Sequence, residues 1–247
     1  MRDLLVIIPA KGNSSRLKKK NLQKIGNYSL VEKKIKDCLI SKIPNQNILL
    51  SSDSEKILQY QKKYNLYPLI KRNKKYTRNN SSTFSVVLES IRNYKRLNKI
   101  KYIAVLPVTN PLLSYKKIYS AYFKLKKNKK INSIISIVEP GSHPFQFVKH
   151  NQKKNSLKFN YFKINGKTYS DYERTQDWPR VFAVSPALKI SRKNFFLKYL
   201  NNTDHLFNKK VFDIRKCTSI LIDNIESIDI NNVHDLKIAR ILNEKKN

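Results

Sequence analysis

Short apolar runs alternate along the chain with segments whose apolar residues recur at helical spacing. The short runs predict strands at Leu4–Ile8, Ile48–Ser51, Tyr67–Ile70, Tyr102–Leu106, Ser133–Val138 and Ser219–Ile222. The amphipathic segments predict helices at Leu30–Ile40, Glu55–Tyr64, Phe84–Leu97, Tyr115–Lys127 and Val233–Leu242. Strands that are apolar throughout and that alternate with helices predict an α/β fold, in which helices cover both faces of a mostly parallel sheet. Ligands of such sheets bind at the carboxyl ends of the strands.

The alternation lapses over residues 141–186. Phe145–Val148 and Leu157–Phe162, with a turn at Asn165-Gly166, predict a hairpin-like insertion that is rich in aromatic residues. A small hairpin cannot bury so many rings by itself, so we expect this insertion to pack on the main domain or on a second subunit. We predict a single domain over residues 1–247, with the insertion at a dimer interface.

The chain carries a net charge of +34, from 51 basic and 17 acidic residues. Such a charge attracts nucleic acid, anionic lipid or polyphosphate. The lysines, however, are dispersed over the polar faces of amphipathic segments, which favours general surface charge over a dedicated polyanion site. Hydrophobic residues make up 40% of the chain, enough for a core, which excludes a disordered polycation.

Cysteine usage and hydropathy indicate a soluble, cytoplasmic protein. Cys38 and Cys217 form no CxxC pair, which argues against a disulfide framework or a structural zinc site. No apolar run approaches the roughly 20 residues of a membrane span, and Leu4–Ala10 is too short for a secretory signal.

The first strand ends at Pro9 and opens into a loop of glycine, small polar residues and cations that reaches Asn21. Backbone amides and positive charge at a strand end predict a phosphate-binding loop, although an exposed basic turn after a buried strand has the same pattern. The loop matches neither GxxxxGK[ST] nor GxGxxG, which argues against an ATPase and a dehydrogenase.

Three further segments carry candidate chemistry, each with a simpler structural alternative. Ser51–Ser54 ends the second strand, and it could simply cap the next helix. Pro107–Leu112 presents Thr109 and Asn110 at a strand tip, or it is a plain turn. Arg174 suits bidentate contact with a carboxylate or phosphate, unless Asp171 or Asp177 pairs with it inside the chain.

Near the C-terminus, Asp229 and Asn231 are two residues apart and project from one face if the segment is extended. Such oxygen ligands suit Mg²⁺, which prefers few protein ligands together with substrate phosphates. Asn232 could also cap the last helix, with Asp235 three positions on, and this capping is compatible with metal binding by Asp229 and Asn231.

Together these segments resemble the CMP–sialic acid synthetase (acylneuraminate cytidylyltransferase) family of sugar-acid cytidylyltransferases. The matching segments, in family order, are Ile8–Leu17 with Lys20-Asn21, Ser51–Ser54, Arg72 with Ser82-Thr83, Pro107–Leu113, His143-Pro144, Arg174–Pro179 and Ser227–Leu236. Each motif is weak, but seven in the right order are specific. The resemblance implies a Rossmann-like nucleotidyltransferase fold, a CTP substrate, Mg²⁺ and a homodimer linked through the hairpin insertion.

The resemblance also implies residue roles. The implied nucleotide-binding residues are Pro9, Ala10, Lys11, Gly12, Asn13, Ser14, Arg16, Lys20, Asn21, Arg72, Ser82 and Thr83. The implied sugar-binding residues are Thr109, Asn110, Arg174 and Gln176. The implied catalytic residues are Lys11, Lys20 and Asp229, and the implied metal ligands are Asp229 and Asn231.

Departures from the family pattern concentrate on the sugar side. Lys11 replaces an arginine, and Asn231 replaces the second metal aspartate. Pro107 replaces a glutamine, while Ala183 and Lys189 stand where sialate-specific members carry arginine and tyrosine. The nucleotide half therefore fits the family better, and we expect a different or variant α-keto sugar acid as acceptor.

The resemblance predicts transfer of CMP from CTP to the anomeric hydroxyl of a sialic acid-like nonulosonate, with release of pyrophosphate, for surface glycan synthesis. Phosphoryl transfer needs positioning more than a special nucleophile, which accounts for the missing Ser/His/Asp and Cys/His patterns. The alternative is a protein that binds nucleic acid or another polyanion on a degenerate nucleotidyltransferase scaffold.

Overall fold

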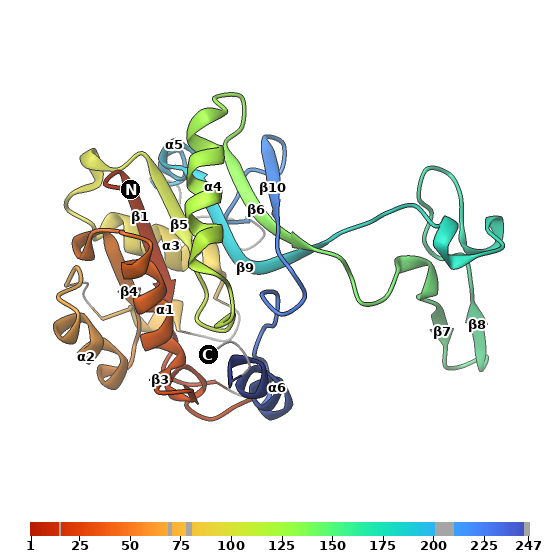
Figure 1. Ribbon diagram of the computed structural model, residues 1–247, viewed down its shortest axis with the longest axis horizontal. Helices are drawn as coiled ribbons and strands as arrows, with labels where there is room; N and C mark the ends of the chain where they lie inside the picture. Colours follow the sequence, from red (N-terminus) through yellow and green to blue (C-terminus); the bar gives the residue numbers. More distant parts are fainter. Residues whose placement is uncertain (15, 69–70, 78–80, 201–209, 245–247) are drawn as a thin grey trace. The chain divides into compact units, whose positions relative to one another are not determined.

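The computed structural model describes residues 1–14, 16–68, 71–77, 81–200 and 210–244. The chain divides into two compact units, which are coloured along the sequence in Figure 1. Unit 1 comprises Met1–Ile137 and Ser185–Asn247, and unit 2 is Val138–Val184.

A six-stranded sheet forms the centre of unit 1. In spatial order its strands are β10 (Cys217–Leu221), β6 (Ser133–Val138), β9 (Ala183–Arg192), β5 (Tyr102–Val105), β1 (Leu4–Pro9) and β4 (Ile48–Ser51). β1 is parallel to β4 and β5, and β10 is parallel to β6, whereas β9 is antiparallel to β5. The predicted mostly parallel sheet is confirmed.

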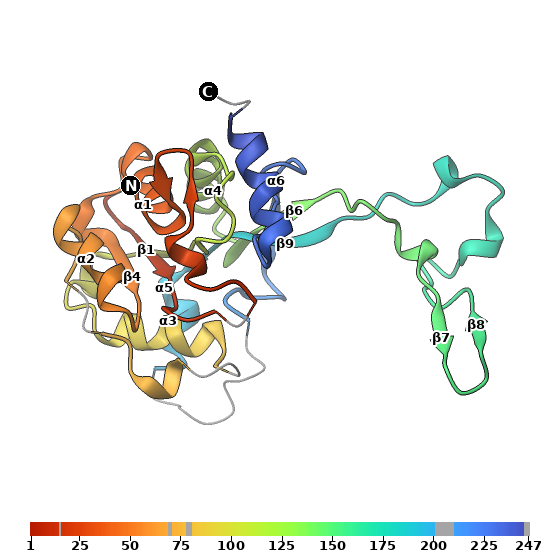
Figure 2. The ribbon, with the colours of Figure 1, turned by 90° about the horizontal axis from the view of Figure 1, so that it is seen from below.

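Helices cover both faces of this sheet, as predicted. The helices are α1 (Leu30–Ile40), α2 (Glu55–Lys63), α3 (Thr83–Arg92), α4 (Tyr115–Lys127), α5 (Lys193–Leu197) and α6 (Val233–Glu244). α1 and α4 lie on one face, and α3 and the short α5 lie on the other (Figure 2). A small hairpin of β2 (Lys24–Ile25) and β3 (Tyr28–Ser29) precedes α1, and Ser29 caps that helix by accepting a bond from Glu32 N.

Burial on both faces of the sheet explains why the strand sequences do not alternate between apolar and polar residues. The five residues Leu4–Ile8 are all fully buried, because β1 has a strand on each side and helices above and below. On the α3 face, Ile7 and Val105 of the sheet belong to one buried cluster with Phe84 and Val87 of the helix. This cluster fixes α3 against the strands whose ends form the site.

The structure corrects one strand prediction and adds a sheet strand that the sequence pattern did not predict. The strand predicted at Tyr67–Ile70 is wrong for Tyr67 and Pro68, which lie in no strand, while residues 69–70 fall outside the described residues. Pro68 has no N–H to donate to a sheet, and Tyr67 instead packs its ring against Tyr94, with ring centroids 4.7 Å apart. β9, conversely, was not predicted, because Pro186 interrupts its apolar pattern.

Unit 2 contains a hairpin, but not with the predicted strands: the strand predicted at Phe145–Val148 is wrong, because Pro144–Gln146 forms a 3-10 turn, and the one predicted at Leu157–Phe162 is confirmed only over Leu157 and Lys158. β7 (Lys149–Asn151) pairs antiparallel with β8 (Ser156–Lys158). Beside it, Phe145 is 3% exposed and contacts the rings of His143, Tyr172 and Trp178. Several rings stay about half exposed: Phe147, Phe159, Tyr161 and Tyr169. Unit 2 thus buries one small cluster and leaves the remaining aromatic residues uncovered.

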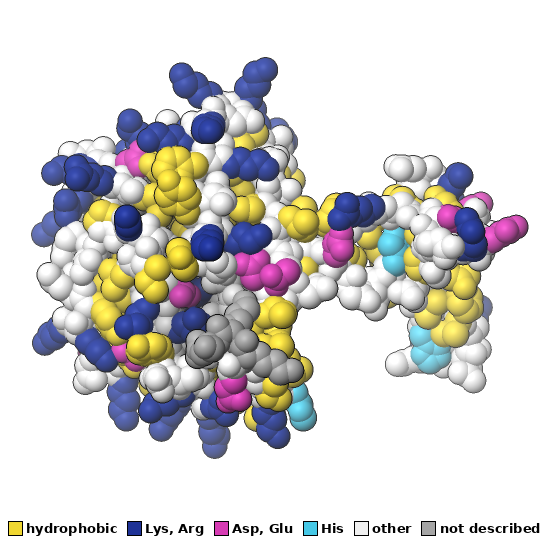
Figure 3. Space-filling view, in the orientation of Figure 1, with side chains coloured by type: hydrophobic (Ala, Val, Ile, Leu, Met, Phe, Trp, Pro, Cys, Tyr) yellow, Lys and Arg dark blue, Asp and Glu magenta, His cyan; other side chains and the backbone are white. Residues whose placement is uncertain are grey.

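Lysine and arginine side chains are spread around the visible face of unit 1 and do not gather in one patch (Figure 3). On this face the distribution agrees with general surface charge. Within the described ranges, no helix combines the length and the apolar character that crossing a membrane requires.

Candidate active site

The loop after β1 is clamped to the end of β4. Ala10 N donates to Ser51 O at 2.9 Å, and Gly12 N donates to Asp53 Oδ1 at 2.7 Å. A Cβ on Gly12 would stand 2.8 Å from the Cβ of Ser54, so the loop can approach this closely only through glycine. Asp53 therefore positions the first loop, whereas the Ser54 side chain makes no capping bond to α2.

The far end of the same loop is closed by a short 3-10 turn, Lys20–Leu22. Asn21 Nδ2 donates to Lys11 O at 2.6 Å, which folds the loop back on itself. Lys20 Nζ donates to Ile230 O at 2.9 Å, which ties the loop to the segment before α6. The predicted phosphate loop and the predicted metal segment are thereby brought together.

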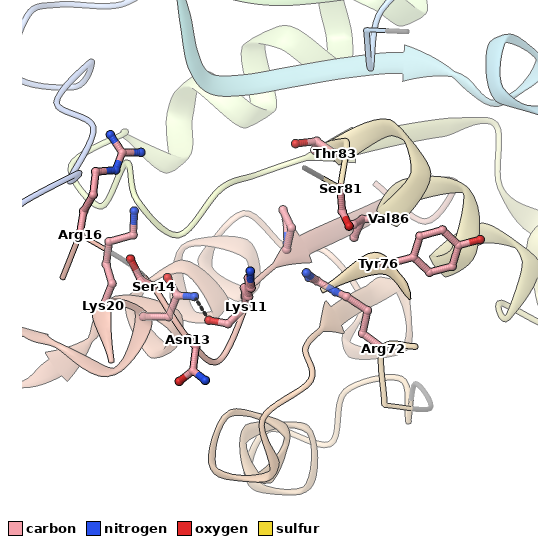
Figure 4. A pocket seen from close by; sticks show the side chains of 12 residues that line it. Lys11, Asn13, Ser14, Arg16, Lys20, Arg72, Tyr76, Ser81, Thr83 and Val86 are labelled. Carbon is pink, nitrogen blue, oxygen red and sulfur yellow. Dashed lines mark hydrogen bonds between the residues drawn. The ribbon is translucent and has the colours of Figure 1, made fainter. Parts of the chain in front are cut away.

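Arg72 binds the end of β4 on the side opposite Arg16 and Lys20 (Figure 4). Its Nε donates to Ser51 Oγ at 3.1 Å and its Nη2 to Ser51 O at 2.5 Å, while its own backbone N donates to Ser52 O. The side chain is buried, and burial lowers the pKa of the guanidinium, an effect opposed by the Asp53 carboxylate. Arg72 is thus held rigidly at the strand end.

These elements enclose a cleft of about 270 Å³. Its lining residues are Pro9, Lys11, Asn13, Ser14, Arg16, Lys20, Asn21, Arg72, Tyr76, Ser81, Thr83 and Val86. Figure 4 shows Arg16 and Lys20 on one side, Arg72 and Tyr76 on the other, and Lys11 between them. Four of the lining side chains are cationic and, among the described residues, none is acidic. The cleft suits a polyanionic ligand such as a triphosphate.

The N-terminus of α3 adds to this field. Ser82 caps the helix by accepting a bond from Ser85 N at 3.1 Å, and the next residue, Thr83, lines the cleft. A helix N-terminus carries partial positive charge and favours anions. Ser82 itself, together with Ala10 and Gly12, frames the cleft without lining it. The other predicted nucleotide-binding residues all line it, and whether they contact a nucleotide remains a prediction.

Sequence reasoning missed Tyr76, Ser81 and Val86 in this lining. Tyr76 ends a short 3-10 turn, Lys74–Tyr76, that follows Arg72 and carries no periodic pattern. The only available signal was an aromatic residue four positions after the predicted arginine. Its half-buried ring offers the cleft an aromatic surface beside the cations.

Asp229 lies beside Lys20. Burial lowers the pKa of the Lys20 ammonium, and the charge of Asp229 opposes that shift. Oδ2 of Asp229 accepts from Asn231 Nδ2 at 3.0 Å, whereas its Oδ1 is buried and has no hydrogen-bond partner among the described residues. A buried carboxylate oxygen without a partner is suited to ligate a cation.

Asn231 lies beside Asp229, as expected for two side chains on one face, and its Nδ2 donates to that carboxylate. Its role as a metal ligand stays a prediction. The predicted cap is present as well, because Asn232 Oδ1 accepts from the backbone N of His234 and of Asp235. No group of three or more His, Cys, Asp or Glu side chains arranged to hold a metal is found in the part of the chain that the structure describes.

The strand-tip loop after β5 is fixed to this same segment. Ile230 N donates to Thr109 O at 2.8 Å, and Asn110 Nδ2 donates to the carbonyls of Ser227 and Ile228. The buried Lys34 of α1 holds the loop from below through a 2.9 Å bond to Asn110 O. Asn110 is fully buried, and its hydrogen bonds hold the Asp229 segment in place. The sugar contact predicted for Asn110 stays a prediction.

The other two predicted sugar-binding residues belong to unit 2. Arg174 is 65% exposed and pairs with Asp177, its Nε lying 2.9 Å from Oδ2. The intramolecular pair considered for Arg174 is therefore present. Gln176 is exposed on the same turn.

A family model described as cytidylyltransferase matches residues 5–246. The chain is 25% identical over 239 residues to a pseudaminic acid cytidylyltransferase of Campylobacter jejuni, covering 96% of this chain and 95% of that protein. It is also 22% identical over 249 residues to a post-translational flagellin modification protein B of Campylobacter coli, covering 100% and 97%.

Solved structures show the same fold. A CMP:2-keto-3-deoxy-manno-octonic acid synthetase complexed with CTP superposes with a TM-score of 0.69 at 11% identity, covering 99% of both chains. A 4-diphosphocytidyl-2C-methyl-D-erythritol synthase from Anaerococcus prevotii superposes with a TM-score of 0.65 at 14% identity, covering 98% and 96%.

Proposed function

This chain belongs to the cytidylyltransferase family, and we propose that it transfers CMP from CTP to the anomeric hydroxyl of a nonulosonic acid of the pseudaminic acid type, releasing pyrophosphate. The product would serve surface glycan synthesis. One observation carries the proposal: Lys11 and Lys20, from the loop after β1, line one cleft with Arg72, which lies about fifty residues further along the chain. The names of the Campylobacter relatives, which match over almost the whole chain, supply the acceptor class.

In the proposed reaction the acceptor oxygen bonds to the α-phosphorus as the bond from that phosphorus to the leaving pyrophosphate breaks, and one proton is released. Negative charge then grows on the phosphate oxygens. Lys11 and Lys20 stabilise that charge from the loop side and Arg72 from the other. Hydrogen bonds fix the side chains of Lys20 and Arg72 and the backbone of Lys11 before substrate arrives. The framework also holds the reactants in line, which lowers the entropic part of the barrier.

Asp229 is the residue that would hold Mg²⁺, through its Oδ1, which finds no hydrogen-bond partner in the described part of the chain. When bound, the ion would withdraw charge from phosphate oxygens as a Lewis acid. One carboxylate is sufficient if substrate phosphates complete the coordination sphere, which is how proteins usually bind this ion. Asn231 orients Asp229 through its Nδ2 bond.

The test is an assay of pyrophosphate release with each of the four nucleoside triphosphates against pseudaminic acid, N-acetylneuraminic acid and 3-deoxy-manno-octulosonic acid. We expect release that requires CTP, Mg²⁺ and a nonulosonic acid, with a CMP-sugar acid identified by mass. Folded protein that binds CTP but yields no product with any of these acids would refute the acceptor assignment.

We also propose that unit 2 mediates homodimer formation. Its rings at Phe147, Phe159 and Tyr161 are about half exposed, which leaves apolar surface that a second subunit could cover. We expect the wild-type chain to have a dimer mass in light scattering and the double substitution Phe159→Ser, Tyr161→Ser to shift it to monomer. The matched control is Tyr119→Ser, which removes an exposed ring from α4. A monomeric wild-type protein, or a variant that remains dimeric, would contradict the proposal.

A further inference from the structure

Lys189 is a partly buried cation that the nucleotide cleft does not use. It lies in β9, an interior strand of the sheet, opposite Val105 at the end of β5. Its Nζ has one described hydrogen bond, a 3.3 Å contact with Pro186 O. Burial lowers the pKa of the ammonium to about 8, and the Asp229 charge opposes this shift.

The strand register places Lys189 on the face of the sheet that carries the cleft. Ile7 pairs with Val105, and Val105 pairs with Lys189, so the three side chains lie in one row on the same face. Ile7 and Val105 both belong to the buried cluster of α3. Pro9, two residues beyond Ile7 and on the same face, lines the cleft, as does Thr83 at the start of α3.

The surroundings leave Lys189 without a full counter-charge. Asp229 attracts its ammonium, but no carboxylate lies within the 4.0 Å ion-pair distance among the described residues, and Lys210 repels it. An ammonium group has three N–H donors, and burying one without partners is costly. A ligand anion bound at the Lys189 ammonium would supply both the charge and the missing acceptors.

The acceptor is the substrate that brings such an anion to this place. The cleft already offers a triphosphate four cations, and one of them, Lys20, interacts with the same Asp229 whose charge acts on Lys189. We propose that Lys189 binds the carboxylate of the acceptor sugar acid and thereby selects acids over neutral sugars. This inference rests on the proposed function and adds the residue that recognises the acceptor's charge.

The experiment combines a side-chain change with a matched change in the acceptor. In Lys189→Met, which keeps the apolar stem, we expect the KM for pseudaminic acid to rise about 10- to 100-fold, the cost of one charge-assisted hydrogen bond. The KM for CTP should change less than twofold. Because the carboxamide of the same acid lacks the charge, we expect the variant to use it no worse than the wild-type enzyme does. Lys127→Met, on the exposed side of α4, is the control and should match wild type.

Three results would overturn the inference: an unchanged KM for the acid, a rise confined to the KM for CTP, or undiminished preference of the variant for acid over carboxamide. A calorimetric titration of the sugar acid, with a non-hydrolysable CTP analogue present, distinguishes failure of the Lys189 proposal from failure of the proposed function. If wild-type protein binds no sugar acid, both fall. If it binds pseudaminic acid and Lys189→Met binds it equally well, only the role of Lys189 falls.

Discussion

Replacing Lys20 with methionine is expected to lower kcat/KM for CTP by about 10²- to 10³-fold, the usual cost of removing one preorganised group that stabilises transition-state charge. Lys20 is fixed by its bond to Ile230 O and stands between the cleft and Asp229. Methionine keeps the apolar stem, so the loop should remain folded. Steady-state pyrophosphate release across a CTP titration measures the loss.

Lys18→Met is the matched control for this change. Lys18 is exposed on the same loop, and its described hydrogen bond is made by the backbone carbonyl, which accepts from Gln23 Nε2. Both variants lower the net charge by one unit, so both weaken any general attraction of CTP equally. Equal losses in the two variants would mean that only the overall field matters, and the specific role of Lys20 would be rejected.

The position of Lys20 was predictable because strands that are apolar on both faces are easy to recognise. Leu4–Ile8 and Ile48–Ser51 have no polar alternation, which required neighbours on both sides and placed their carboxyl ends at one edge. The cytidylyltransferase family match agrees with the family proposed from the ordered motifs. The sheet edge and most of the cleft lining could therefore be inferred without coordinates.

Contacts between distant residues were not predictable in the same way. Asp53 reads locally as part of a helix cap, yet it accepts from Gly12 N, 41 residues away. Asn110 reads as a ligand-facing amide, yet it is buried against the carbonyls of residues more than 100 positions later. Local sequence specifies which side chains can bond, whereas tertiary packing decides which partner each one meets.

β9 is a whole strand that local sequence did not predict. Pro186 within the strand and the aromatic insertion before it obscured the apolar pattern, so Lys189 could be noted only as a departure from a family position. The antiparallel pairing with β5 gives that lysine a location beside Asp229. No periodicity in the sequence encodes this neighbour relation.

Replacing Asp229 with asparagine is expected to reduce kcat on the order of a hundredfold, because the change removes the charge that would hold Mg²⁺ while keeping the shape of the side chain. The rise in melting temperature that Mg²⁺ and CTP together produce in wild-type protein should shrink accordingly, since ligand binding stabilises only the folded state that binds it. Asp223→Asn, an exposed aspartate earlier in the same segment, is the control and should keep both activity and the shift.

The reciprocal change, Asn231→Asp, tests the same site from the other direction. It replaces the Nδ2 donor 3.0 Å from Asp229 Oδ2 with a second carboxylate. Two like charges at that distance repel, so the variant should melt at a lower temperature in EDTA than wild type does. Added Mg²⁺ should reverse the loss and reach its half-maximal effect on rate at a lower concentration, because two carboxylates bind the ion more tightly than one. A variant indifferent to Mg²⁺, together with full activity in Asp229→Asn, would remove the metal from this segment.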